Sequence, residues 1–247
     1  MANPVLEKQF GAATADAALQ TVQPPLATGA DTMSIGSVIT STLVLLILVT
    51  GGAAYGWANA AAVQRWYWLL AVTMITLLIA TVARPKLVVV TGVFYSLVQG
   101  ALLGSLSKIY ETWYDGIVFQ ALLGTLAVFV AMLFLYGTRI IKVTQRLRSV
   151  IIVATVGLAL FYLFSWVLIF FGAEIPVVTG AGTGAIVFTL IVIVIAALNL
   201  LLDFQVIEQG VRSGAPKAFS WFAAFGLMVT IIWLYVSILR LLAITRR

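Results

Sequence analysis

The chain contains neither cysteine nor histidine in its 247 residues. Without cysteine it can form no disulfide and no thiolate metal site, and without histidine it has no imidazole ligand and no Ser/His or Cys/His nucleophile pair. Charge is also scarce, because only 9% of the residues are Asp, Glu, Lys or Arg. Most hydrolytic mechanisms are therefore excluded.

Hydrophobic residues take the place of the missing charges. They make up 63% of the chain, and the mean hydropathy is +1.14. A helix needs about 20 apolar residues to cross a bilayer. Uncharged stretches of about this length predict an all-α integral membrane protein with seven transmembrane helices, at residues 38–57, 66–82, 87–106, 116–136, 149–171, 183–202 and 219–243.

The first 34 residues differ from the rest of the chain. They are rich in Ala, Thr and Gly, contain Pro24 and Pro25, and show no sustained apolar period. We expect a flexible or membrane-surface tail over residues 1–34, on the cytoplasmic side, followed by a transmembrane domain over residues 35–247.

Basic residues are concentrated in one set of the short connections. Two, Arg65 and Lys108, lie in the connections on the far side from the N-terminus, and eight lie on the near side: Arg84, Lys86, Arg139, Lys142, Arg146, Arg148, Arg212 and Lys217. Because retained basic loops are cytoplasmic, the N-terminus is predicted to be cytoplasmic. The formal charge of +6 thus reflects topology and does not indicate nucleic-acid binding.

The C-terminus conflicts with this scheme. Seven crossings would place Arg246 and Arg247 outside, whereas a re-entrant last segment would return them to the cytoplasm. The pattern leaves both arrangements open.

Small residues recur at four-residue spacing in the third stretch. Gln99 lies beside a face formed by Gly92, Ser96, Gly100 and Gly104, and the fourth stretch offers Gln120, Ala121, Gly124 and Thr125. In lipid, such residues mark places where helix backbones approach closely. The glycines predict tight packing, whereas a buried glutamine amide can either line a polar path or hold helices together.

The sixth stretch is closed by a carboxylate, Asp203, which shares one helical face with Thr189, Ala196 and Asn199. That face is expected to look into the protein. The helix macrodipole at a C-terminal end and partial burial both disfavour a negative charge. The sequence therefore predicts a carboxyl that can act as a proton-controlled element.

Two simpler interpretations of Asp203 are that it is hydrated at the cytoplasmic interface, or that it pairs with Arg84 or Arg139. Glu208, Arg212 and Lys217 are expected in a solvated turn beyond the helix end.

The last stretch carries Thr230, Trp233, Ser237 and Arg240 on one face. We expect Arg240 to extend to the headgroups. Tryptophans near the predicted helix ends are typical of an aromatic belt.

Segments spread over nearly the whole chain carry a family resemblance: "NPVLEKQF", "DTMSIGSVITST", "VQGALLG", "GIVFQALLGTLAVF", "LLLDFQVIEQGVRSGAPKAFSWFAAFGLMVTIIWLY" and "LRLLAI". They resemble the Bax inhibitor-1/YccA-like family, also called the transmembrane Bax inhibitor motif proteins, and look closest to its bacterial branch. The resemblance implies a plasma (inner) membrane protein with seven helices, the last of them central in the bundle.

The resemblance also implies a pH-sensitive calcium leak or channel. In that family two acidic residues, on the sixth and seventh helices, share a proton and latch the pore closed. Asp203 matches the first, but Ser237 stands at the position matched to the second, and Gln99 stands where many relatives have an acid. These residues cannot form a coupled pair of acids, and they leave fewer hard oxygen ligands for calcium.

The function predicted first is a calcium (cation) leak channel gated through Asp203. Ser237, Asn199 and Gln99 are its candidate neighbours on the ion path, and Arg84, Arg139 and Arg240 are possible charge partners. Lipid, calcium and protons are the expected partners; no cofactor is predicted.

The alternative is a non-conducting membrane partner, such as a regulator of a membrane protease or an accessory subunit of a larger membrane complex. An enzyme is not expected, because an intramembrane aspartyl protease needs two facing aspartates and a retinal protein needs a lysine in the last helix.

Overall fold

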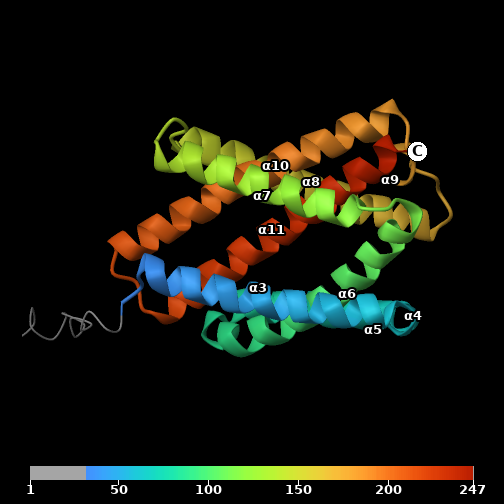
Figure 1. Ribbon diagram of the computed structural model, residues 1–247. Helices are drawn as coiled ribbons and strands as arrows, with labels where there is room; N and C mark the ends of the chain where they lie inside the picture. Colours follow the sequence, from blue (N-terminus) through green and yellow to red (C-terminus); the bar gives the residue numbers. More distant parts are fainter. Residues whose placement is uncertain (1–31, 247) are drawn as a thin grey trace, which may run out of the picture.

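The computed structural model describes residues 32–246 (Figure 1), so most of the predicted tail, residues 1–34, lies outside the described residues. The described chain is a bundle of helices. In chain order its elements are α3 Ile35–Ala58, α4 Ala60–Arg65, α5 Tyr67–Ala83, the 3-10 turn η1 Pro85–Leu87, α6 Val88–Trp113, α7 Ile117–Gly137, α8 Gln145–Phe170, α9 Pro176–Thr179, α10 Thr183–Arg212 and α11 Ala218–Thr245.

Six helices between residues 32 and 246 are long and apolar enough to cross a membrane: α3, α6, α7, α8, α10 and α11. The prediction of an all-helical, multi-pass membrane protein is therefore confirmed. Helix α5 covers the predicted stretch 66–82 but has only 17 residues. At 1.5 Å per residue it is about 25 Å long, somewhat less than the roughly 30 Å of a hydrocarbon core. The count of seven crossings stays a prediction.

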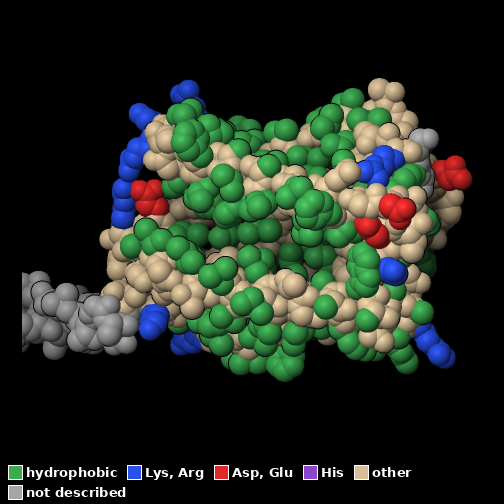
Figure 2. Space-filling model, in the orientation of Figure 1, with side chains coloured by type: hydrophobic (Ala, Val, Ile, Leu, Met, Phe, Trp, Pro, Cys, Tyr) green, Lys and Arg blue, Asp and Glu red, His purple; other side chains and the backbone are tan. Residues whose placement is uncertain are grey.

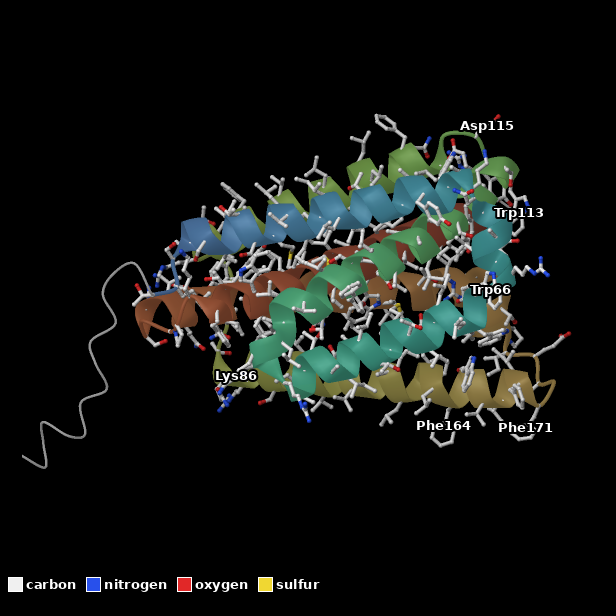
Figure 3. The ribbon with its side chains drawn as sticks, turned by 90° about the horizontal axis from the view of Figure 1, so that it is seen from below. Trp66, Lys86, Trp113, Asp115, Phe164 and Phe171 are labelled. Carbon is white, nitrogen blue, oxygen red and sulfur yellow. The ribbon has the colours of Figure 1, made fainter. Side chains whose placement is uncertain are left out.

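The connections gather at two opposite ends of the bundle, with a hydrophobic band between them (Figures 1 and 2). At the first end, the start of α3 meets the α10–α11 connection, where Met33 N donates to Ala215 O at 2.7 Å. At the second end, Lys108 lies over the ring of Trp57, 5.0 Å from its centroid. Figure 3 places Lys86 at the first end and Trp66 at the second. Which end faces the cytoplasm stays a prediction.

Helix α11 runs from the first end to the second without interruption (Figure 1). Beyond its last turn, Arg246 donates to Asp115 O at 3.2 Å and to Gln120 Oε1 at 2.6 Å, which places it beside the α6–α7 connection. A re-entrant last segment would have returned Arg246 to the end where α3 begins. That alternative is therefore wrong.

The last helix is also the most buried of the six. In its most apolar window 61% of the residues are buried, against 17% to 44% in the other five helices. It packs against α3, α6, α7 and α10, and fully buried side chains such as Met228, Leu234 and Leu239 lie along it. The prediction that the last helix is central agrees with this packing.

Glycines bring α3 and α6 into direct backbone contact. A Cβ atom on Gly100 or Gly104 of α6 would overlap the carbonyl oxygen of Val49 or Ala53 on α3. On the α3 side, a Cβ on Gly52 would lie 2.5 Å from Leu97 O. The predicted close packing of the α6 stripe is confirmed, but its partner is α3, and the fourth stretch does not supply it. On α7, Gly124 faces Ile238 of α11 instead.

Helix α10 continues ten residues beyond its predicted end at Leu202, to Arg212. Charge in this segment suggested a turn, but Glu208 and Arg212 form an ion pair at i,i+4 spacing on the helix. Gly210 lies within this helix and close to Met33, because an added Cβ would stand 2.6 Å from the Met33 Sδ atom. The predicted solvated turn at Glu208 and Arg212 is therefore wrong, and Asp203 does not lie at a helix end.

Candidate ion-handling site

Asp203 lies on α10, nine residues before the helix ends, and faces α11. A Cβ atom on Gly226 of α11 would stand 3.7 Å from Asp203 Oδ1, an ordinary van der Waals distance, so Gly226 lies directly beside the carboxylate. The side chain of Thr230, one turn further along α11, interacts with the same carboxylate. Because Thr230 Oγ1 also donates to Gly226 O at 3.2 Å, the three residues form one small polar contact between the two helices.

The second carboxylate oxygen, Asp203 Oδ2, is buried and has no hydrogen-bond partner among the described residues. No described arginine or lysine forms an ion pair with it either. A buried charge without a partner is costly, by several kcal/mol after relaxation. The arrangement therefore accommodates a neutral carboxyl, while an ionised one would need water, a cation or a movement of the helices.

Ser237 does not lie beside Asp203. Its hydroxyl donates to Trp233 O of its own helix at 2.8 Å. Ser237 is seven residues beyond Thr230, which is about 10 Å along α11 at 1.5 Å per residue. Asp203 and Ser237 therefore do not occupy facing positions, and Gly226 and Thr230 are the residues that face the carboxylate.

The two predicted amide neighbours lie elsewhere. Asn199 Nδ2 donates to Thr155 Oγ1 of α8 and to Ile195 O, each at 2.8 Å, so Asn199 joins α10 to α8. Gln99 is partly buried on α6, and its Oε1 atom has no hydrogen-bond partner among the described residues. The structure thus separates Asn199 from the α10–α11 contact, and it leaves Gln99 as a second unsatisfied polar group.

None of the three predicted charge partners contacts Asp203. Arg84 is exposed at the end of α5, and Arg139 lies 3.6 Å from Glu208. Arg240 donates to Val177 O and Val178 O, at 2.9 and 2.7 Å, where α9 ends. Its guanidinium thus binds the carbonyls of the α8–α10 connection, and the extension of Arg240 to the headgroups stays a prediction.

A metal cage of carboxylates is absent from the part of the chain that the structure describes. No group of three or more Asp or Glu residues there is arranged to hold an ion. The cation-related chemistry available at this site comes from one carboxylate, one hydroxyl and backbone oxygens.

Sequence reasoning missed two of the three residues that form this contact as partners of Asp203. The sequence places Thr230 on one face with Ser237, but Gly226 gives no signal of its own, because a single glycine in an apolar helix is common. Pairing Gly226 and Thr230 with Asp203 requires knowing that α10 extends to Arg212.

The fold and the contact define a multi-pass helical membrane protein. Its fifth long helix, α10, carries a partly buried carboxylate that faces the central helix α11 and forms no ion pair with a described residue. The chain matches the family described as Bax inhibitor 1 like over residues 3–247 and belongs to that family. No curated protein sequence matches it.

Proposed function

We propose that the protein is a cation leak channel, with calcium as the transported ion and protonation of Asp203 as its control. Membership of the Bax inhibitor 1 like family, which is associated with calcium leak activity, supports this proposal. The observation that carries it is the buried Asp203 Oδ2 atom without a partner at the contact between α10 and the central helix.

The proposed control follows from that contact. A neutral carboxyl lets α10 rest against α11 across Gly226. Once Asp203 loses its proton, the charge needs water or a cation beside Oδ2, and meeting that need separates the two helices. Opening of the α10–α11 contact thus admits the ions that stabilise it.

Residue 237 is a serine and not a second acid, so few oxygen ligands are available for calcium. Calcium prefers six to eight oxygen ligands, whereas Asp203 and Thr230 supply few. We therefore propose that the ion passes largely hydrated, without a tight resting site, and that gating involves a single carboxyl and not a proton shared between two. The proposed location is the plasma membrane, with the N-terminus cytoplasmic.

The proposal is tested by calcium flux into proteoliposomes that contain the purified protein. We expect flux above that of protein-free vesicles, reduced several-fold or lost in Asp203→Asn. Glu208→Gln is the matched control, because Glu208 is on the same helix but lies near its end and is paired with Arg212. No difference between the two variants would contradict a role for Asp203.

The alternative of a non-conducting membrane partner is favoured by one observation, the serine that is bonded within its own helix at position 237. It predicts silent flux under all conditions and a stoichiometric protein partner after gentle purification.

A further inference from the structure

A long groove opens on the membrane-facing side of the bundle. It lies between α3 and α7 with α11 as its floor, and its volume is about 1470 Å³. Figure 2 shows the hollow on the face that Figure 1 presents. Asp203 is not among its lining residues, although its neighbour Phe204 is.

The body of the groove is apolar, and its walls face outward. Ile39 and Leu43 of α3 are each 54% exposed, and Leu126 of α7 is 57% exposed. These side chains lie within the helices that cross the membrane. A hydrocarbon chain is the chemistry that fits such walls, because most of the lining side chains are apolar. The Tyr235 hydroxyl on the floor is bonded to Ser107, and Thr125 donates to Ala121 O of its own helix.

One end of the groove carries a basic rim. It consists of Arg139, Lys142 and Arg212, all of them exposed, and it includes one acid, Glu208. Glu208 accepts from the Tyr136 hydroxyl and pairs with Arg139 at 3.6 Å and Arg212 at 2.5 Å.

Three cations thus face one anion at this rim. Each guanidinium has five N–H donors, so both arginines keep donors free for a second anion, and Lys142 has no ion pair with a described residue. Arginine binds phosphate through two parallel hydrogen bonds.

We propose that this groove is a binding site for an anionic phospholipid. The phosphate lies against Arg139, Lys142 and Arg212, and an acyl chain extends from Tyr136 along the apolar floor. The rim lies at the end of the bundle, where helix ends meet the headgroups, and basic pockets between helices on that side bind anionic headgroups. A phospholipid matches both features at once, since it joins a phosphate to a hydrocarbon chain.

The charge pattern favours a phospholipid over a second copy of the chain as the occupant of the groove. The described surface that a second copy would offer at this end is itself basic, with Arg84, Lys86, Arg146, Arg148 and Lys217 exposed there. Like charges at one end disfavour a parallel copy in the groove. An anionic headgroup is instead attracted to the basic rim.

The test is native mass spectrometry of the full-length protein in detergent, with phosphatidylglycerol and phosphatidylcholine added in equal amounts. We expect preferential retention of phosphatidylglycerol. The triple variant Arg139→Gln, Lys142→Gln, Arg212→Gln should lose that preference, at about fivefold in affinity for each cation removed. The double variant Arg84→Gln, Lys86→Gln, at the same end but outside the groove, should keep it.

Loss of the arginines leaves Glu208 unpaired, so Lys142→Gln alone provides a variant with the ion pairs intact. It should weaken phosphatidylglycerol retention about fivefold without changing the unfolding temperature. Equal retention of both lipids by the wild type, or equal weakening in the Arg84/Lys86 variant, would overturn the proposal.

A second copy or another protein in the groove would also overturn it. Because the chain has no native cysteine, Leu126→Cys places one thiol on the groove wall. We expect no disulfide between copies in lipid vesicles and no stoichiometric protein partner in the native spectrum. Either species in place of the lipid would refute a phospholipid site.

Discussion

Asp203 Oδ1 lies 3.7 Å from the point where a Cβ atom on Gly226 would stand. This distance is an ordinary van der Waals contact, so an alanine fits at residue 226 and a larger side chain does not. The contact between α10 and the central helix α11 therefore depends on how little residue 226 occupies.

The first prediction concerns this contact. Gly226→Leu should force α10 away from α11 beside Asp203, lower the stability by about 1–3 kcal/mol as overpacking does, and raise calcium flux. Gly226→Ala should fold as well as the wild type and leave flux unchanged. Thermal unfolding and proteoliposome flux measure the two effects. A Leu variant with wild-type flux and stability would show that the helices do not meet at this point.

The second prediction separates Thr230 from Ser237. The Ser237 hydroxyl is bonded to its own helix, so Ser237→Ala should leave the pH profile of flux unchanged. Thr230→Val removes the hydroxyl that interacts with the Asp203 carboxylate. Its loss should therefore alter the pH profile of calcium flux. A changed pH profile in Ser237→Ala but not in Thr230→Val would contradict this and would make Ser237 the partner of Asp203.

The register of the α10–α11 hairpin explains why Ser237, the position that the family resemblance matched to a second acid, does not face Asp203. Asp203 is nine residues before the end of α10, and Gly226 and Thr230 are eight and twelve residues after the start of α11. Residues at similar distances from the connection face each other in an antiparallel pair of helices. Ser237 is nineteen residues after the start of α11, too far along that helix to face Asp203. A predicted end of α10 at Leu202 leaves out residues 203–212, so this register could not be derived from the sequence.

Other features could be predicted because they rest on local patterns. The apolar stretches located the long helices, since lipid requires about 20 apolar residues wherever a helix crosses. The α6 glycines correctly indicated close packing, but a stripe of small residues carries no information about its partner. The α6 stripe packs on α3 because Gly52 and Gly56 of α3 lie against it. These two glycines do not stand out within the apolar stretch 38–57.

The third prediction concerns that glycine contact. A Cβ on Gly56 would overlap the backbone of Ala101, so Gly56→Ala should lower the free energy of unfolding by about 1–3 kcal/mol. Gly51, on the same helix, has nothing within 4 Å of an added Cβ. Gly51→Ala should therefore be neutral or slightly stabilising, by up to about 1 kcal/mol from helix propensity. Equal effects in thermal or denaturant unfolding would exclude direct contact between α3 and α6.

The fourth prediction concerns the crossing of α11. Single cysteines in place of Lys217 and Thr245, both exposed and at opposite ends of α11, should react with a membrane-impermeant maleimide from opposite sides of the membrane. The cysteine-free wild type is the blank. Labelling of both positions from the same side would mean that α11 does not cross.

The most direct measurement for the central claim is the initial rate of calcium flux as a function of pH, in the wild type and in Asp203→Asn. Asparagine keeps the shape of the side chain but cannot ionise, so the substitution removes the charge without emptying the contact. The account predicts a pH-dependent flux in the wild type and a low, pH-independent flux in Asp203→Asn, with Glu208→Gln retaining the wild-type profile. An unchanged pH profile in Asp203→Asn would contradict the account.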